Sequence, residues 1–263
     1  MCAFPLFFHE LRHFQMNTLS VDTHIPLQKT ANISQYAYGL RETANTSPAR
    51  YIYGLGGVAR EIADTFSRMN DPIAGFVVDS EYISQSPAEI LNIPVISFDE
   101  YAALSTHFNT SITVSLGEPL HRKKLSEKLT ALNLTEGTIA IGDYLAADSS
   151  VGDGTILHAG SVVSSRCSVG KSCLINKKAM IEHDNSMGDY CVFSPYAVTG
   201  GHVSIGNNCF VGLGACIRDR VKIGDDVIIG IGAVVTRDIE DGVVVYGNPA
   251  RVISQNLTHK VFA

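Results

Sequence analysis

The chain has 263 residues, of which 45% are hydrophobic, and a formal net charge of −6. This length accommodates one large domain or two smaller ones with a sizeable core. The acidic balance argues against a nucleic-acid-binding protein, which is usually basic. No apolar stretch reaches the ~18 residues of a membrane span, and the six cysteines include no CxxC pair. We therefore expect a cytoplasmic protein with free cysteines.

The first 134 residues divide into two parts. Residues 1–49 have mixed composition and weak periodicity, and we expect an N-terminal extension for which Met16 is an alternative start. Residues 50–134 alternate between two kinds of pattern, which predict strands at 51–53, 74–78, 93–96 and 111–115 and helices at 59–69 and 121–132. This alternation indicates parallel strands with crossover helices, as in a small Rossmann-like α/β domain.

A glycine-rich loop follows the first predicted strand. Gly54 and Gly56 open a helix, and Asp79 ends the next strand, which satisfies the dinucleotide fingerprint in outline. Taken alone, the loop suggests an NAD-dependent enzyme. However, about 70 residues from Tyr51 to Gly117 are too few for a full dinucleotide domain. A half-sized domain can hold one nucleotide diphosphate at the helix N-terminus.

Basic residues near the loop have two interpretations. They can meet a phosphate group, or they can be exposed charges on the helices; the residues are Arg60, Arg122 and Lys123.

From about residue 139 a period of six residues begins. Every sixth residue from Val151 to Val235 is apolar except Thr199, and small or apolar residues recur two places earlier. This period fits neither an α-helix nor an ordinary strand, and it predicts a parallel β-helix with three hexads per coil. Residues 18 apart then stack at about 4.8 Å. Four cysteines occupy the small-residue position and should lie in the core: Cys167, Cys173, Cys191 and Cys209.

Stacking predicts a site around His183. A histidine is suited to remove a proton from an attacking amine or hydroxyl, and Glu182 and Asp184 flank it as possible orienting carboxylates. One coil later lie Thr199, the break in the apolar pattern, and Gly201. Glycine leaves the backbone open, so that its N–H can bind a thioester carbonyl. Alternatively, the glycine pair merely forms a corner.

The remaining β-helix histidines are expected to have no catalytic role. His158 and His202 lack the flanking acids of His183. The histidine spacing of the β-helix carbonic anhydrases is also broken, because residue 188 is glycine. We therefore expect no metal site.

The repeat resembles that of the hexapeptide-repeat acyltransferases, whose left-handed parallel β-helices form trimers. The segment Gly247–Ile253 is similar to their C-terminal signature. An α/β domain before this β-helix resembles the NeuD/PglD-like family of sialic-acid O-acetyltransferases and UDP-4-amino-sugar N-acetyltransferases. The matching segments are Tyr51–Gly57, Gly75–Asp79, Ser115–Gly117 with Arg122, Ile175–Asn176 and Ile181–Asp184.

The resemblance implies a function and a site. It implies transfer of an acetyl group from acetyl-CoA to the amine of a nucleotide-linked amino sugar in surface-glycan biosynthesis, by a homotrimer without a metal. It implies His183 as the general base, Asp184 as its favoured partner before Glu182, and Asn176 as a further catalytic residue. Contacts to acetyl-CoA are implied at Gly201, Leu213 and Ala233. Contacts to the nucleotide sugar are implied at Gly54, Gly56, Gly57, Asp79 and Gly117.

Two departures and two alternatives accompany this resemblance. Many family members carry histidines where this chain has Val58 and Val192, which affects the sugar and donor contacts respectively. Acetylation of a hydroxyl, as on sialic acid, requires the same base and stays open. A non-catalytic β-helix that serves assembly is the third hypothesis.

The predicted domains are residues 1–49, 50–134 and 135–263, the last with a C-terminal cap.

Overall fold

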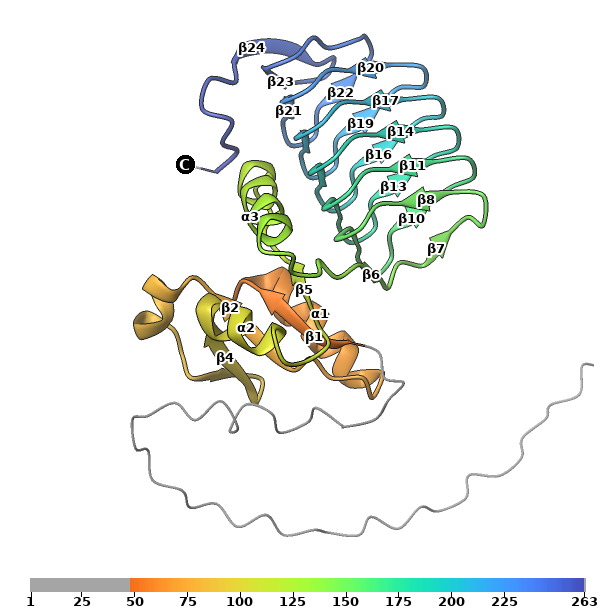
Figure 1. The fold of residues 1–263 in the computed structure, drawn as a ribbon. Helices are drawn as coiled ribbons and strands as arrows, with labels where there is room; N and C mark the ends of the chain where they lie inside the picture. The colour runs from red at the N-terminus through yellow and green to blue at the C-terminus, as the bar shows by residue number, and fades with distance from the viewer. Residues whose placement is uncertain (1–47, 263) are drawn as a thin grey trace, which may run out of the picture. The chain divides into compact units, whose positions relative to one another are not determined.

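The structure is a computed structural model that describes residues 48–262, so nearly all of the predicted N-terminal extension lies outside the described residues. Figure 1 shows an α/β domain followed by a solenoid of short parallel strands. Within residues 48–262, no helix is both long enough and apolar enough to cross a membrane.

A five-stranded sheet forms the centre of the α/β domain, in the order β3-β4-β2-β1-β5. Its strands are β1 (Ala49–Tyr53), β2 (Gly75–Val78), β3 (Glu89–Ile90), β4 (Ile93–Ser97) and β5 (Thr110–Val114). Strands β1, β2, β4 and β5 pair in parallel, and β3 pairs antiparallel with β4. The parallel strands correspond to the four predicted apolar runs. Such strands are apolar because crossover connections cover both faces of a parallel sheet.

The helices of this domain are α1 (Gly57–Arg68), α2 (Phe98–Ser105) and α3 (Pro119–Ala131), with a 3₁₀ helix at Ser80–Gln85. The sequence interpretation missed α2. This helix begins with a capping box, in which the Ser97 hydroxyl accepts the Glu100 N–H at 3.2 Å and the Glu100 carboxylate accepts the Ser97 N–H at 2.8 Å. A serine followed three residues later by a glutamate is therefore the sequence signal that could have predicted the start of this helix.

Two-residue strands recur every six residues from β8 to β22 and form three parallel sheets. We name each sheet by its outward side chains, which are covered by the α/β domain on the first, apolar on the second and mostly serine on the third. The covered face consists of β6 (Ile139–Ala140), β9 (Ile156–Leu157), β12 (Leu174–Ile175), β15 (Val192–Phe193), β18 (Phe210–Val211) and β21 (Ile228–Ile229), extended by the cap strands β23 (Val243–Tyr246) and β24 (Arg251–Gln255). The apolar face consists of β7 (Tyr144–Leu145), β10 (Val162–Val163), β13 (Met180–Ile181), β16 (Val198–Thr199), β19 (Cys216–Ile217) and β22 (Val234–Val235). The serine face consists of β8 (Ser150–Val151), β11 (Ser168–Val169), β14 (Ser186–Met187), β17 (Ser204–Ile205) and β20 (Lys222–Ile223).

The strands pair with the predicted offset of 18 residues. Val163 lies beside Ile181, for example, and Ser168 beside Ser186. The second residue of most strands points inward and is buried, and the four cysteines predicted for the core are also buried. Three hexads therefore make one coil.

The corners between strands use a left-handed backbone conformation at every sixth residue. Asp184 has a φ of 61° and His202 has a φ of 60°. Asparagine, aspartate and histidine tolerate this conformation better than most residues. The solenoid geometry therefore places both side chains at equivalent corners, one coil apart.

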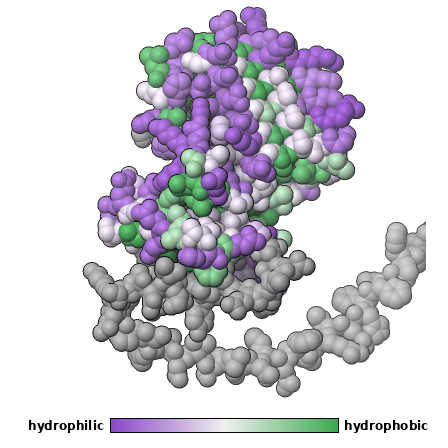
Figure 2. All heavy atoms as spheres, in the orientation of Figure 1, coloured by the Kyte–Doolittle hydropathy of each residue, from purple (hydrophilic) through white to green (hydrophobic). Residues whose placement is uncertain are grey.

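The outward sides of the three faces differ in chemistry. On the covered face, outward residues such as Ile156, Leu174 and Val192 are buried in one cluster with residues of the α/β domain. On the apolar face, the outward residues are half-buried or exposed: Tyr144, Val162, Met180, Val198, Cys216 and Val234. Figure 2 shows apolar residues running along the β-helix beside a polar band. On the serine face, the exposed outward residues are Ser150, Ser168, Ser186, Ser204 and Lys222.

Arg122 joins α3 to the β-helix. Its side chain is fully buried, and it donates to the carbonyls of Leu116 at 3.0 Å, Ser172 at 2.6 Å and Cys173 at 3.1 Å. Burial lowers the pKa of its guanidinium to about 10, so that the group stays cationic at neutral pH. Arg122 is therefore neither an exposed helix charge nor free to meet a phosphate, and both sequence interpretations of this residue were wrong.

We expect Arg122→Met to lower the free energy of unfolding by about 3 kcal/mol, because several buried carbonyls lose their donor at once. Urea denaturation followed by circular dichroism measures the change. Lys124→Met is the matched control, because Lys124 is an exposed residue of the same helix. Equal losses in the two variants would contradict a structural role for Arg122.

Candidate active site

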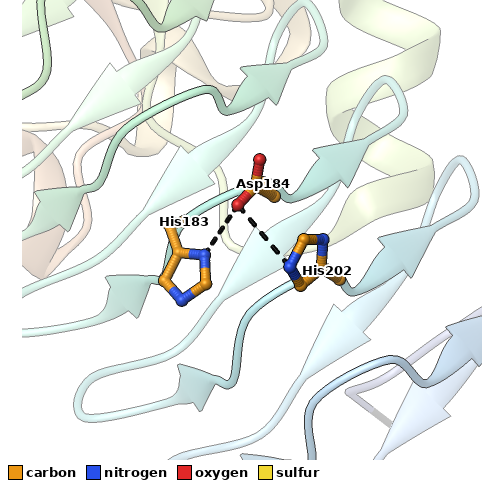
Figure 3. A group of neighbouring side chains, drawn as sticks. All are labelled: His183, Asp184 and His202. Carbon is orange, nitrogen blue, oxygen red and sulfur yellow. Dashed lines mark hydrogen bonds and ion pairs between the residues drawn. The ribbon is translucent and has the colours of Figure 1, made fainter.

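His183 lies at the corner that connects β13 to β14. Its side chain is 52% exposed, and its Nδ1 lies 2.7 Å from Oδ2 of Asp184 (Figure 3). Since an ionised carboxylate only accepts, Nδ1 carries the proton in this hydrogen bond, and in the neutral imidazole Nε2 then keeps a free lone pair. The corner thus presents a basic ring nitrogen toward solvent.

Asp184 is held by a second partner from the coil below. Arg166 donates to both carboxylate oxygens, through Nε to Oδ1 at 2.6 Å and through Nη2 to Oδ2 at 2.9 Å. Arg166, followed by His183, holds the pKa of Asp184 well below its usual range. Asp184 therefore remains ionised under any condition in which the histidine works.

His202 lies one coil above Asp184. Its Nε2 is 3.7 Å from Asp184 Oδ2, and its ring meets that of His183 edge-on, with centroids 5.4 Å apart. Asp184 therefore lies between the two rings (Figure 3). The sequence interpretation set His202 aside and missed Arg166, although both follow from the stacking rule as Asp184 plus or minus 18.

Thr199 explains the break in the apolar pattern. Its side chain is buried, and its hydroxyl accepts the N–H of Glu182 at 3.0 Å and the side-chain amide of Asn185 at 2.5 Å. The strand pairing accordingly joins Met180 to Val198. The threonine thus fixes the two residues that bracket His183 and Asp184.

Gly201 lies directly against His183. A β-carbon at residue 201 would lie 2.5 Å from Cε1 and 2.8 Å from Nε2 of the imidazole, which no side chain can do without displacing the ring. The need for glycine at this corner is therefore steric. Among the described residues, no backbone carbonyl accepts the Gly201 N–H.

Among residues 48–262, the two other predicted catalytic residues, Glu182 and Asn176, make no hydrogen bond to the imidazole. The backbone N–H of Glu182 donates to the Thr199 hydroxyl, and Asp184 is the carboxylate that is hydrogen-bonded to His183. Asn176 lies at the preceding corner of the same coil, where its side-chain oxygen accepts the N–H of Lys177 at 2.8 Å.

The residues predicted to contact acetyl-CoA differ in their exposure and in the corner of the β-helix at which they lie. Leu213 is 48% exposed, at the corner between the covered and apolar faces, whereas Gly201 lies at the corner between the apolar and serine faces. Ala233 is fully buried inside the β-helix, so its side chain faces no ligand. Val192 is buried in the cluster of the covered face.

The glycine loop leaves the N-terminus of α1 open. A β-carbon at Gly56 or Gly57 would meet nothing within 4 Å, and no side chain caps the helix. Gly54 has a φ of +107°, a conformation that favours glycine. The free N–H groups of a helix N-terminus are suited to an anion such as a diphosphate.

Asp79 and Gly117 already have neighbours within the chain. Lys128 lies 3.4 Å from Asp79, and burial, followed by a hydrogen bond to Asp79, raises the pKa of Tyr53. The ring of Phe262 lies 3.9 Å from a β-carbon placed on Gly117.

His183, Asp184 and His202 bring potential metal-ligand atoms within 4.8 Å of one another, a grouping that the sequence interpretation did not expect. However, both oxygens of Asp184 are already occupied by Arg166. His158 is buried elsewhere, with its Nε2 3.6 Å from a Glu61 carboxylate oxygen.

Comparisons with known proteins agree with this architecture. Residues 51–129 match the family described as the PglD N-terminal domain. No curated protein sequence matches the chain significantly.

Three solved structures are similar over most of the chain. PerB from Caulobacter crescentus, in complex with CoA and GDP-perosamine, is 26% identical with a TM-score of 0.72, and the match covers 80% of this chain and 99% of PerB. The acetyltransferase domain of PglB from Neisseria gonorrhoeae, in complex with acetyl coenzyme A, is 25% identical with a TM-score of 0.69, over 79% and 100% of the chains. WeeI from Acinetobacter baumannii is 25% identical with a TM-score of 0.67, over 79% and 100%.

An α/β domain, a hexad β-helix and an outward histidine–aspartate pair together define a hexapeptide-repeat acetyltransferase. The predicted fold class, with a left-handed parallel β-helix, is confirmed. The match of residues 51–129 to the PglD N-terminal domain and the similarity to PerB and PglB support the predicted resemblance to the NeuD/PglD-like enzymes.

Proposed function

We propose that this enzyme transfers an acetyl group from acetyl-CoA to the amine of a nucleotide-linked amino sugar, as a step of surface-glycan biosynthesis. The observation that carries this proposal is the His183–Asp184 pair, exposed at a β-helix corner with Gly201 against its ring. PerB, which is similar over 80% of this chain, was solved with CoA and the nucleotide amino sugar GDP-perosamine.

In the proposed reaction, the sugar nitrogen attacks the thioester carbonyl carbon while His183 Nε2 takes its proton. Asp184 accepts the Nδ1 proton and stabilises the imidazolium that forms. We assign the oxyanion contact to the Gly201 N–H, which no backbone carbonyl accepts among residues 48–262. When the intermediate collapses, the C–S bond breaks, and the CoA thiolate takes the proton from His183. The products are the acetamido sugar and free CoA.

The substrates are assigned to separate surfaces. We place the diphosphate at the open N-terminus of α1, around Gly54, Gly56 and Gly57, because free helix N–H groups favour an anion. Asp79 and Gly117 border that loop as secondary contacts. Acetyl-CoA is assigned to the region of Gly201 and Leu213, and Ala233 is left out of this assignment because the whole residue is buried.

The homotrimer is part of this proposal. Exposed apolar side chains such as Met180, at 38%, and Tyr144, at 54%, line one face of the β-helix, whereas the serine face is polar. A continuous apolar strip of this kind is typical of a protein–protein interface. The corners that carry Gly201 and Leu213 border this face on opposite sides, so a neighbouring copy packed on it can complete a donor site. The cytoplasm remains the expected compartment, because buried free thiols such as Cys173 suit reducing conditions.

We expect Met180→Glu to dissociate the trimer, because the change places a charge on an apolar interface. Size-exclusion chromatography with light scattering measures the mass. Ser186→Glu, in the same coil on the serine face, should leave the trimer intact. If both variants keep the wild-type mass, the apolar face is not the interface.

The nature of the acetylated atom is tested on the product. We expect the acetyl group on nitrogen, so treatment with hydroxylamine, which cleaves esters but not amides, should leave the product unchanged. Loss of the acetyl group would establish O-acetylation instead. Both outcomes use the same base, so the product decides between them.

A further inference from the structure

The corner that carries Asp184 forms a column of charged and polar side chains, one per coil: Asp148, Arg166, Asp184, His202 and Arg220. Its three central members are in contact. Arg166 binds Asp184 from below, and His202 lies 3.7 Å from it above. Two rings therefore compete for the same oxygen, Oδ2, which His183 Nδ1 holds at 2.7 Å.

Arg166 binds Asp184 with the geometry of a specific clamp. Its two hydrogen bonds run in parallel to the two oxygens, which fixes the plane of the carboxylate. The backbone holds both residues as well, since Asp148 accepts the N–H of Arg166 at 3.2 Å and Ser165 accepts that of Asp184 at 2.9 Å. The carboxylate therefore cannot rotate toward His202 without breaking a bidentate pair.

The clamp contributes little to folding. The Arg166 side chain is 67% exposed, and solvent-exposed ion pairs of this kind stabilise proteins weakly. Another corner of the β-helix is held differently, by carboxylate or amide oxygens that accept backbone N–H groups, as Asn207 does from Asp189 at 2.9 Å. The bidentate pair occurs at the corner that carries His183.

We infer that Arg166 is a positioning residue for the reaction. It holds Asp184 on Nδ1 of His183 rather than on His202, and so keeps Nε2 of His183 as the free base. This inference rests on the proposed function, because it assigns a role relative to His183 as base.

Arg166→Met is expected to lower kcat about tenfold, because the base loses its fixed orientation, and to leave the KM for acetyl-CoA within about twofold. The thermal midpoint should stay near that of the wild type. Arg166→Lys should retain intermediate activity, since lysine keeps the charge without the fork. Guanidinium ion, at concentrations well below those that unfold the protein, should restore part of the activity of Arg166→Met.

Double substitution identifies the route of the effect. If Arg166 acts through Asp184, then adding Arg166→Met to Asp184→Asn should cause no further loss of kcat. Arg220→Met is the matched control in the same column, because among residues 48–262 the Arg220 side chain forms a single ion pair, with Asp219 at 3.9 Å. Additive losses in the double variant, or equal kcat in Arg166→Met and Arg220→Met, would overturn the inference.

A readout without substrate separates this inference from the proposed function. In protein labelled with ¹⁵N-histidine, we expect His183 to show one tautomer, with its proton on Nδ1, and a mixture in Arg166→Met. His183→Ala assigns the resonance. Should His183→Ala keep full turnover, the proposed base fails. If His183→Ala is inactive while Arg166→Met keeps both its tautomer and its kcat, only the role of Arg166 fails.

Discussion

Replacing His183 with alanine is expected to lower kcat for acetyl transfer by about 10²-fold or more. The neutral amine can still attack the thioester, but its proton then has to pass to water during bond formation. The side chain is 52% exposed at a corner and packs into no core, so the variant should fold normally. The effect should therefore fall on the chemical step and not on the amount of folded enzyme.

Thiol release from acetyl-CoA measures this loss, with circular dichroism and light scattering as checks on fold and assembly. His107→Ala is the control, because His107 is an exposed histidine of the α/β domain, outside the described site. Near-normal turnover of His183→Ala would show that another group accepts the proton.

Gly201→Val is expected to cause a comparable loss of kcat, with a higher KM for acetyl-CoA. Its β-carbon would lie 2.5 Å from Cε1 of His183, so the imidazole has to leave the position in which Asp184 holds it. A displaced base can cost about 10²-fold in rate. The side chain would also cover the N–H group that we assign to the oxyanion.

A combination of substitutions tests the steric explanation. Gly201→Ala places the same β-carbon against the ring and should lower the thermal midpoint. Removing the ring in His183→Ala/Gly201→Ala should restore much of that stability, because the clash disappears. If the double variant is as unstable as Gly201→Ala, glycine is required by the corner itself, which was the alternative interpretation of the sequence.

The stacking rule explains how much of the structure could be predicted. Each coil has a fixed length of 18 residues, so the sequence placed Gly201 against His183 and Thr199 in the core above Ile181. The same rule could have found Arg166 and His202. They were missed because they lie at corners, where the hexad pattern does not constrain residue type.

Other features depend on contacts for which the sequence has no period. Arg122 resembles an ordinary exposed cation of an amphipathic helix, and only the tertiary structure buries it under carbonyls of the β-helix. Ala233 occupies the small-residue position of the hexad, which predicts burial in the core, and the residue is buried there. The family resemblance implied a contact with acetyl-CoA instead. A single chain also presents an apolar face whose partner its sequence does not specify.

The most direct test of the central claim is the rate of thiol release from acetyl-CoA by the wild-type enzyme, with UDP-, GDP- and dTDP-linked amino sugars and with free sialic acid as acceptors. We predict rapid thiol release with at least one nucleotide-linked amino sugar and no thiol release with sialic acid. A well-folded enzyme that is silent with every acceptor, or that acts on sialic acid alone, would contradict the proposed function.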